Sequence, residues 1–149
     1  MGTPVASSVI SGTARGVVAA MAMSGLRRMT TTLGLVADTP PEAIVETTMP
    51  AIFGRIPEER RPVIVEAVHW TYGGLGGAAF GLLPRKVRRH PLTGLIYGVL
   101  FWTAFEVGIA PVLGLPHAHR QKPEEEAALL VDHLLYGVVV AASAWPHRD

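Results

Sequence analysis

The stretch PVIVEAVHWTYGGLGGAAFGLL, residues 62–83, decides the fold class. It is apolar for long enough to cross the hydrocarbon core of a bilayer as a helix, which takes about 20 residues. Three of its glycines, Gly73, Gly77 and Gly81, recur four residues apart and therefore share one helix face. Small residues on one face allow a second helix to approach closely. We therefore predict a membrane-spanning helix that packs against a neighbour through its glycines.

Three further apolar segments have a comparable length, at about residues 9–26, 92–115 and 127–145. Only helices and closed barrels satisfy all backbone groups in lipid, and these segments are too long for barrel strands. We expect one all-α domain over residues 1–149, a four-span transmembrane helix bundle. The alternative is a soluble four-helix bundle, whose helices should carry charged faces along their length. Residues 95–105 contain no charged side chain, which favours the membrane.

The composition points the same way. Apolar residues make up 49% of the chain and charged residues 17%, against roughly 25% charged residues in soluble domains. The mean hydropathy is +0.33. A net charge of +1 is too small to create an electrostatic field that attracts nucleic acid. The chain has no cysteine, which excludes disulfides, thiolate zinc sites and thiol catalysis. It also has no G-x-S-x-G and no phosphate-binding loop between a strand and a helix, so we expect no enzyme.

Charged loops predict the orientation. Arg85, Lys86, Arg88 and Arg89 lie between the second and third segments, and the positive-inside rule places that loop in the cytoplasm. With four spans, both termini are then cytoplasmic. The region of residues 39–61 lies on the outer side, and its Pro-Glu pair at residues 41–42 favours a short helix. That region is either an interfacial helix between spans one and two or an ordered loop packed on the bundle.

A pentapeptide repeat indicates two related halves. The pattern H-x-x-Y-G occurs at residues 69–73 and again at residues 133–137. A Pro-Glu-Glu triplet precedes each copy, at residues 57–59 and 123–125. Spans one and three would run in the same direction, as would spans two and four. We therefore predict a bundle built from two similar helix pairs.

Every predicted span carries small residues at the spacing that lets helices pack closely. The glycines concerned are Gly12, Gly16, Gly73, Gly77, Gly81, Gly94, Gly98 and Gly137. This pattern is typical of a compact bundle or of a homo-oligomer.

Five ionisable residues inside the apolar segments form a predicted polar cluster: Glu66, His69, Glu106, Asp132 and His133. With a helical rise of about 1.5 Å per residue, His69, Glu106 and His133 all lie about 10 Å from the outer end of their spans. Glu66, His69 and Gly73 share one face, whereas the adjacent Asp132 and His133 cannot point the same way. Polar residues in lipid are costly, so the cluster is the candidate site.

Four roles fit the predicted polar cluster. The residues can hydrogen-bond between helices and fix their register, or they can relay protons or ions. Glu66-x-x-His69 is also half of a carboxylate-bridged di-iron motif, but Leu130 stands where the second acid is needed, which leaves a mononuclear site with Glu106. The fourth role is haem held by His69 and His133. The metal is therefore unknown, and no cofactor is our first expectation, ahead of a metal or haem.

Several features of the chain from about residue 60 onward resemble the YagU-like group of small bacterial inner-membrane proteins. The similar parts are His69 with the glycine-rich span, Pro84 with its basic turn, Gly94, Leu113-Gly114-Leu115 and Asp132-His133-Leu134. The resemblance implies a multi-pass protein of the bacterial cytoplasmic membrane, loosely linked with stress or acid tolerance. It implies no catalytic residue.

We expect a non-enzymatic structural or accessory membrane component. The second expectation is a small transporter or proton-linked or ion-linked protein that uses the predicted polar cluster, and the third is a membrane metal-binding protein. The expected partners are the lipid bilayer and either another membrane protein or further copies of the chain, with no nucleic acid.

Overall fold

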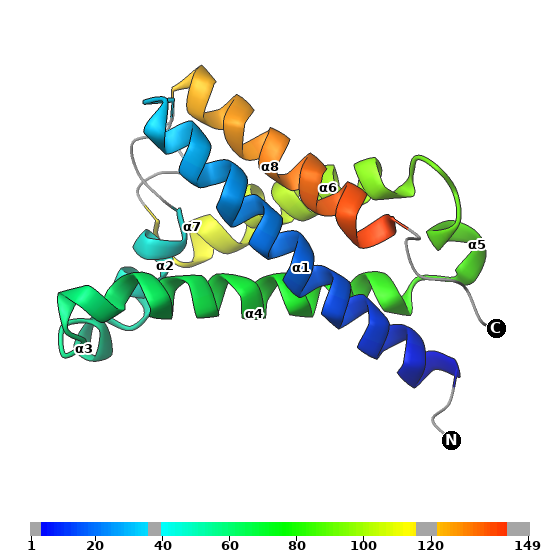
Figure 1. Ribbon diagram of the computed structural model, residues 1–149, viewed down its shortest axis with the longest axis horizontal. Coiled ribbons are helices and arrows are strands. Elements are labelled where there is room, and N and C mark those ends of the chain that lie inside the picture. Colours follow the sequence, from blue (N-terminus) through cyan, green and yellow to red (C-terminus); the bar gives the residue numbers. More distant parts are fainter. Residues whose placement is uncertain (1–3, 36–39, 116–121, 143–149) are drawn as a thin grey trace.

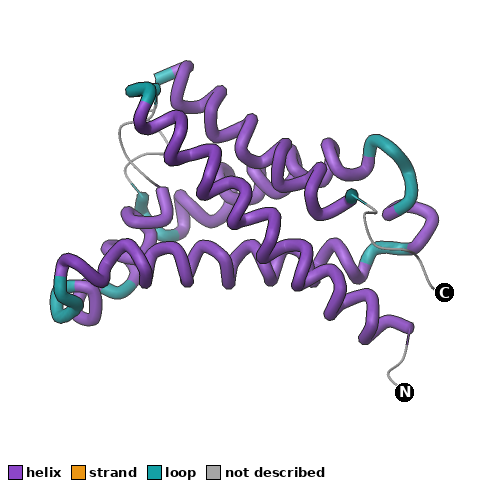
Figure 2. The backbone as a smooth tube through the Cα atoms, viewed as in Figure 1, coloured by secondary structure: helices purple, strands orange, loops and turns teal. Residues whose placement is uncertain are grey.

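The computed structural model describes residues 4–35, 40–115 and 122–142, and every regular element in these ranges is a helix (Figures 1 and 2). The all-α prediction is therefore confirmed. The elements are α1 (Pro4–Thr32), α2 (Pro40–Thr48), α3 (Pro50–Phe53), η1 (Glu58–Arg60), α4 (Arg61–Leu82), α5 (Arg85–Arg88), α6 (Thr93–Thr103), η2 (Ala104–Ile109), α7 (Ala110–Val112) and α8 (Pro123–Ala141).

The long helices follow the predicted segments with shifted ends. α4 differs from the predicted 62–83 by one residue at each end, and α1 extends beyond 9–26 in both directions. α8 begins at Pro123 and not at residue 127, because proline suits the first helical turn and the acids that follow suit the positive end of the helix. Residues 143–145 of the predicted fourth segment lie outside the described residues.

Among the described residues, two helices, Val5–Thr32 and Thr93–Val112, are long and apolar enough to cross a membrane, judged by length and composition. The second of these is continuous through α6, η2 and α7. The four-span arrangement stays a prediction.

Glycines bring α1 and α4 into close contact, and Figure 1 shows the two helices crossing. A Cβ on Gly12 would overlap the carbonyl oxygen of Gly77, and one on Gly16 would overlap that of Gly73. A Cβ on Gly81 would overlap the carbonyl oxygen of Ser8. These two backbones therefore approach as closely as they do because side chains are absent from the contact.

A second glycine contact joins α6 to α8 in the same manner. A Cβ on Gly98 would overlap the carbonyl oxygen of His133, and one on Gly137 would overlap that of Gly94. The chain thus contains two tightly packed pairs, α1 with α4 and α6 with α8. α1 also packs against α8, which joins the pairs.

The third apolar segment contains a π-helical stretch, η2. Pro111 follows two residues after its end, and proline has no N–H and crowds the carbonyl four residues earlier, here that of Val107. A widened turn is the local consequence, and α7 continues the helix, with Leu113 N–H donating to the Ile109 carbonyl at 3.0 Å. Glu106 lies inside this widened turn.

The connection between α1 and α4 contains the short helix that the Pro-Glu pair predicts, α2, followed by α3. It packs on α4 through a small core of Val45, Phe53 and Val65. Pro50 ends the first of these helices and begins the second. The connection therefore covers one end of α4 and brings α2 beside the candidate site.

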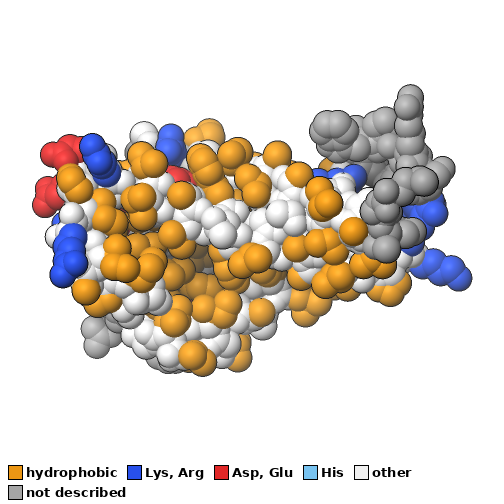
Figure 3. Space-filling model, turned by 90° about the horizontal axis from the view of Figure 1, so that it is seen from below, with side chains coloured by type: hydrophobic (Ala, Val, Ile, Leu, Met, Phe, Trp, Pro, Cys, Tyr) orange, Lys and Arg blue, Asp and Glu red, His pale blue; other side chains and the backbone are white. Residues whose placement is uncertain are grey.

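The main core is small, and much of the apolar surface faces outward. The buried core residues are Ala19, Met23, Phe80, Tyr136 and Val140. By contrast, Ile10, Leu75, Val107 and Val112 are between 66% and 84% exposed. On the face seen in Figure 3, charged side chains gather toward the two ends, and hydrophobic side chains cover much of the middle.

Candidate functional site

Ser24 on α1 is the centre of a hydrogen-bonded network with α4. Its hydroxyl lies 2.5 Å from Oε2 of Glu66 and 3.2 Å from Nδ1 of His69. The indole N–H of Trp70 donates to the Ser24 oxygen at 3.2 Å. Glu66, His69 and Trp70 project from consecutive positions of one α4 face, because residues three or four apart lie next to each other on a helix.

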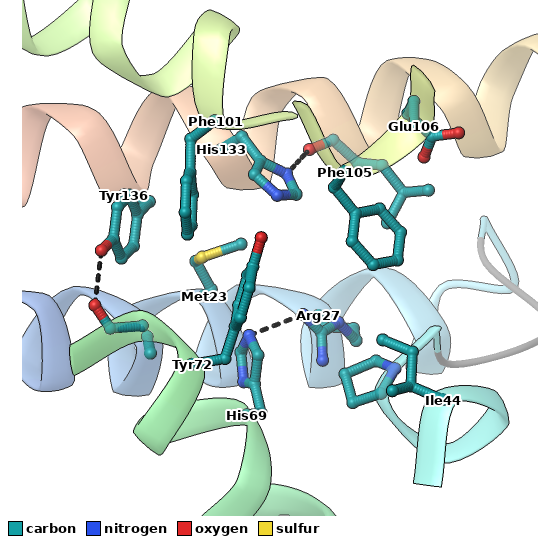
Figure 4. Close-up of a pocket in the computed structure, with 14 residues that line it drawn as sticks. Met23, Arg27, Ile44, His69, Tyr72, Phe101, Phe105, Glu106, His133 and Tyr136 are labelled. Atoms are coloured by element: carbon teal, nitrogen blue, oxygen red, sulfur yellow. Dashed lines mark hydrogen bonds between the residues drawn. The ribbon is translucent and has the colours of Figure 1, made fainter. Parts of the chain in front are cut away.

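The contacts around His69 determine which group donates and which accepts in each hydrogen bond of this network. Nη2 of Arg27 lies 3.5 Å from Nε2 of His69 (Figure 4). A guanidinium group only donates, so Nε2 accepts and the proton of the ring lies on Nδ1. Nδ1 then donates to Ser24, and the Ser24 hydroxyl donates to Glu66. The hydrogen bonds therefore run in one direction, from Arg27 to the Glu66 carboxylate.

Arg27 also links this network to α8. Its Nε lies 3.7 Å from Oδ2 of Asp132, and the two residues are 7% and 3% exposed. One arginine on α1 thus contacts α4 through His69 and α8 through Asp132. We call Ser24, Arg27, Glu66, His69 and Asp132 the Arg27 network. The exposed Arg28 adds a peripheral ion pair with Glu66, at 3.8 Å.

A partly open cavity of about 50 Å³ lies beside the network, between α1, α2, α4, α6, η2 and α8. Its wall is mostly apolar. Its basic and acidic side chains are Arg27, His69, Glu106 and His133. Figure 4 shows these side chains around the space together with Phe101 and Phe105.

His133 is held by its own helix. Its Nδ1 donates to the carbonyl of Leu129 at 2.8 Å (Figure 4). Its ring centroid lies 6.1 Å from that of Phe101. Asp132 and His133 therefore meet different partners, the first Arg27 and the second the cavity.

The two H-x-x-Y-G copies contact each other directly. The hydroxyl of Tyr136 from the second copy donates to the carbonyl of Gly73 in the first copy, at 2.6 Å. The ring of Phe101 stacks between Tyr72 and Tyr136, at centroid distances of 5.0 and 4.9 Å. In each copy the histidine faces the cavity, the tyrosine joins the aromatic stack and the glycine packs against another helix.

The predicted polar cluster is thus divided between two places. Glu66, His69 and Asp132 belong to the Arg27 network, whereas His133 and Glu106 line the cavity, which His69 also lines. Within the described residues Glu106 makes no hydrogen bond or ion pair. It is a half-buried carboxylate on the cavity wall.

Sequence reasoning missed Arg27 as a site residue. Arg27 and Arg28 stand side by side just after the first apolar segment, so neither stands out from the sequence alone. The spacing contained a usable signal, because Gly12, Gly16, Ala20 and Ser24 recur every four residues and Arg27 follows three later. Because each step of four residues advances about 40° around a helix, Arg27 lies at the centre of the face that packs against α4, whereas Arg28 lies beyond its edge and, among the described residues, reaches only Glu66.

A protein metal site usually brings three or more ligand side chains together. No group of three or more His, Asp or Glu side chains in the ranges 4–35, 40–115 and 122–142 lies together in a way that could hold an ion. Glu66 and His69 come within 3.9 Å of each other, and both are engaged by Ser24.

Comparison with protein-family models, with curated proteins and with solved structures found no match to this chain. The resemblance to the YagU-like group stays a prediction that rests on the residues quoted for it.

Proposed function

We propose that this chain is a non-enzymatic integral membrane protein, a structural or accessory component of the bacterial inner membrane. One observation carries the proposal. Thr93–Val112 is the more hydrophobic of the two candidate spans, and only 17% of its most apolar window is buried within the protein. The apolar core helix of a soluble protein is mostly buried, whereas a helix in lipid exposes its apolar side chains.

The distribution of charge supports the same proposal. On the face of Figure 3 a hydrophobic band separates charged ends, as expected of a surface that meets lipid in its middle. We propose that α4 and α8 cross the membrane beside α1 and the α6–α7 helix, which gives four spans. α2 and α3 would then lie at the outer interface, where the exposed Ile52 meets lipid headgroups.

The Arg27 network gives the proposed bundle its specificity. Lipid chains are as apolar as leucine, so burial alone does not hold membrane helices together, and close packing and interhelical hydrogen bonds do. Arg27 contacts both α4 and α8, and the glycine contacts need one register in each pair. We infer that the network selects the correct arrangement of three helices.

Site-directed labelling tests the location and the orientation together. The chain has no cysteine, so single cysteines introduced at the exposed Lys86 in α5 and the exposed Ile52 in α3 can be labelled without background. In intact cells we expect a membrane-impermeant thiol reagent to label Ile52→Cys and not Lys86→Cys, with the protein retained in membranes after alkaline carbonate. The opposite labelling would reverse the orientation, labelling of both would refute the topology, and release by carbonate would refute the membrane assignment.

A second candidate function, a small transporter or a proton-linked or ion-linked protein, is favoured by Glu106. This carboxylate lines the cavity, has no partner among the described residues and lies in a π-helical turn, a feature frequent at functional sites. A pH-dependent flux in vesicles that Glu106→Gln abolishes while the protein stays folded would favour this function. Equal flux with and without the protein would exclude it.

A further inference from the structure

The cavity presents hydrogen-bond donors from a buried arginine. Arg27 lines the cavity, is 7% exposed and carries five N–H groups. Among the described residues it contacts His69 through Nη2 and Asp132 through Nε, and the Nε–H has no hydrogen-bond acceptor. A buried guanidinium group with unused donors is costly, so the site is suited to a ligand that brings an acceptor.

The same cavity presents an acceptor on a different helix. Nδ1 of His133 donates to the Leu129 carbonyl, so in the neutral ring the other nitrogen, Nε2, is an acceptor, and it has no partner in the part of the chain that the structure describes. His133 comes from α8 and Arg27 from α1, and both line the cavity (Figure 4). A ligand that fits both carries an acceptor and an N–H or O–H donor near each other.

The charges around the cavity favour an uncharged ligand. An anion at Arg27 would meet Asp132, whose carboxylate lies 3.7 Å from Nε, and Glu106 on the cavity wall. A cation, although drawn to the Glu106 carboxylate, would meet Arg27 in the same cavity. In a site of low dielectric each of these like-charge approaches is strongly unfavourable.

The remaining wall favours a flat ring. Tyr72, Phe101 and Tyr136 form a stack with centroid distances of 5.0 and 4.9 Å, and all three line the cavity. Met23 and Ile44 complete an apolar surface. Aromatic rings prefer stacked or edge-on neighbours, and apolar pockets with a few polar groups are the usual form of small-molecule sites.

We propose that this cavity binds a small uncharged aromatic compound that carries a carbonyl group and a neighbouring N–H or O–H group. The carbonyl oxygen accepts from Arg27, the donor meets Nε2 of His133, and the ring packs on the aromatic stack. The cavity is partly open, so a ligand larger than its 50 Å³ would extend outward from it. This site is additional to the structural role proposed above and does not depend on it.

Three ring compounds of nearly equal size test the proposal: benzamide, which is neutral, benzoate, which is an anion, and benzylamine, which is a cation at neutral pH. Binding to the full chain in detergent micelles is measured by ligand-observed NMR, with empty micelles as background. We expect benzamide to bind at least about tenfold more tightly than either charged compound. An equal or higher affinity for benzoate or benzylamine, or no binding of benzamide above background, would overturn the proposal.

Two variants locate the binding. Ile44→Trp fills the cavity from α2 without removing a charge and is expected to abolish benzamide binding. Arg27→Gln is expected to weaken it by about tenfold or more, and the exposed neighbour Arg28→Gln is the matched control that leaves it unchanged. Full benzamide affinity in Ile44→Trp would overturn the proposal even if Arg27→Gln does not fold.

Discussion

At the scale of the residue, Arg27 is the member of the Arg27 network that joins three helices. It lies on α1 and contacts both His69 of α4 and Asp132 of α8. Truncating one member of a buried ion pair leaves the other charge without compensation, which usually costs more than the pair itself contributes.

We predict that Arg27→Met destabilises the protein by about 3 kcal/mol, because the carboxylate of Asp132 stays buried without its partner. The measurement is thermal or denaturant-induced unfolding in detergent. The double variant Arg27→Met with Asp132→Leu should recover much of the loss, since it removes both charges. A double variant no more stable than the single one would show that the ion pair is not the cause.

Which polar residues could be predicted from the sequence depended on their surroundings. Glu66 and His69 stand out because they interrupt an apolar run, and the structure places them in one network. Arg27 does not stand out, since it ends an apolar run beside a second arginine. What distinguishes Arg27 is the face of α1 on which it lies. The residue spacing identifies this face as the packed one only when the partner helix is known to be α4.

At the scale of the element, the structure has two close-packed helix pairs that use glycine in the same way. In α1 with α4 and in α6 with α8, a Cβ on the central glycine would overlap a backbone carbonyl of the facing helix. Not all glycines serve this purpose. Gly25 lies on the exposed side of α1 with no atom near its missing Cβ.

We predict that Gly77→Ala costs about 1–3 kcal/mol, because the added methyl group overlaps the Gly12 carbonyl and forces α1 away from α4. The matched control Gly25→Ala should be neutral or stabilising by up to about 1 kcal/mol, because alanine favours helix and the site is open. Unfolding midpoints in detergent compare the two. Equal effects of both substitutions would contradict the close contact seen between the helices.

The long helices could be predicted because a helix is the structure that satisfies the backbone hydrogen bonds of a long apolar run within the run itself. α4 agrees with its predicted segment to within a residue at each end. The π-helical turn could not be predicted in this detail. Pro111 indicates that the third helix is disturbed, but the form of the disturbance depends on how the turns before it pack. The start of α8 at Pro123 was missed because the three acids after the proline are not apolar, although they suit a helix N-terminus.

At the scale of the whole molecule, the glycine faces are occupied within one chain. The glycines predicted to serve either a compact bundle or an oligomer contact α1, α4, α6 and α8 of the same molecule. Any association with a further copy or another membrane protein would therefore use the exposed apolar surface, such as that around Val107 and Val112. The two pairs meet through α1 and α8, where Ala19 packs with Tyr136 and Val140.

We predict that the chain can be divided in the turn between α5 and α6 and that the two co-expressed parts purify together in mild detergent. The parts share the Tyr136–Gly73 hydrogen bond, the Arg27–Asp132 ion pair and the core around Ala19. Ala19→Leu, which enlarges a fully buried residue at this junction, should separate them. Gly25→Ala should not, and co-purification that survives Ala19→Leu would place the main junction elsewhere.

The contacts of Arg27 with two later helices have a consequence for how the chain folds during synthesis. During synthesis α1 is finished first, yet the acceptors of its arginine arrive much later, His69 with α4 and Asp132 with the last helix of the described chain. In the proposed membrane protein, the guanidinium group of Arg27 would have no partner until then, which would keep this end of α1 close to water or to an insertion factor. Its burial against His69 and Asp132 requires α1, α4 and α8 together, so the accessibility of Arg27 distinguishes the assembled bundle from shorter intermediates of the described chain.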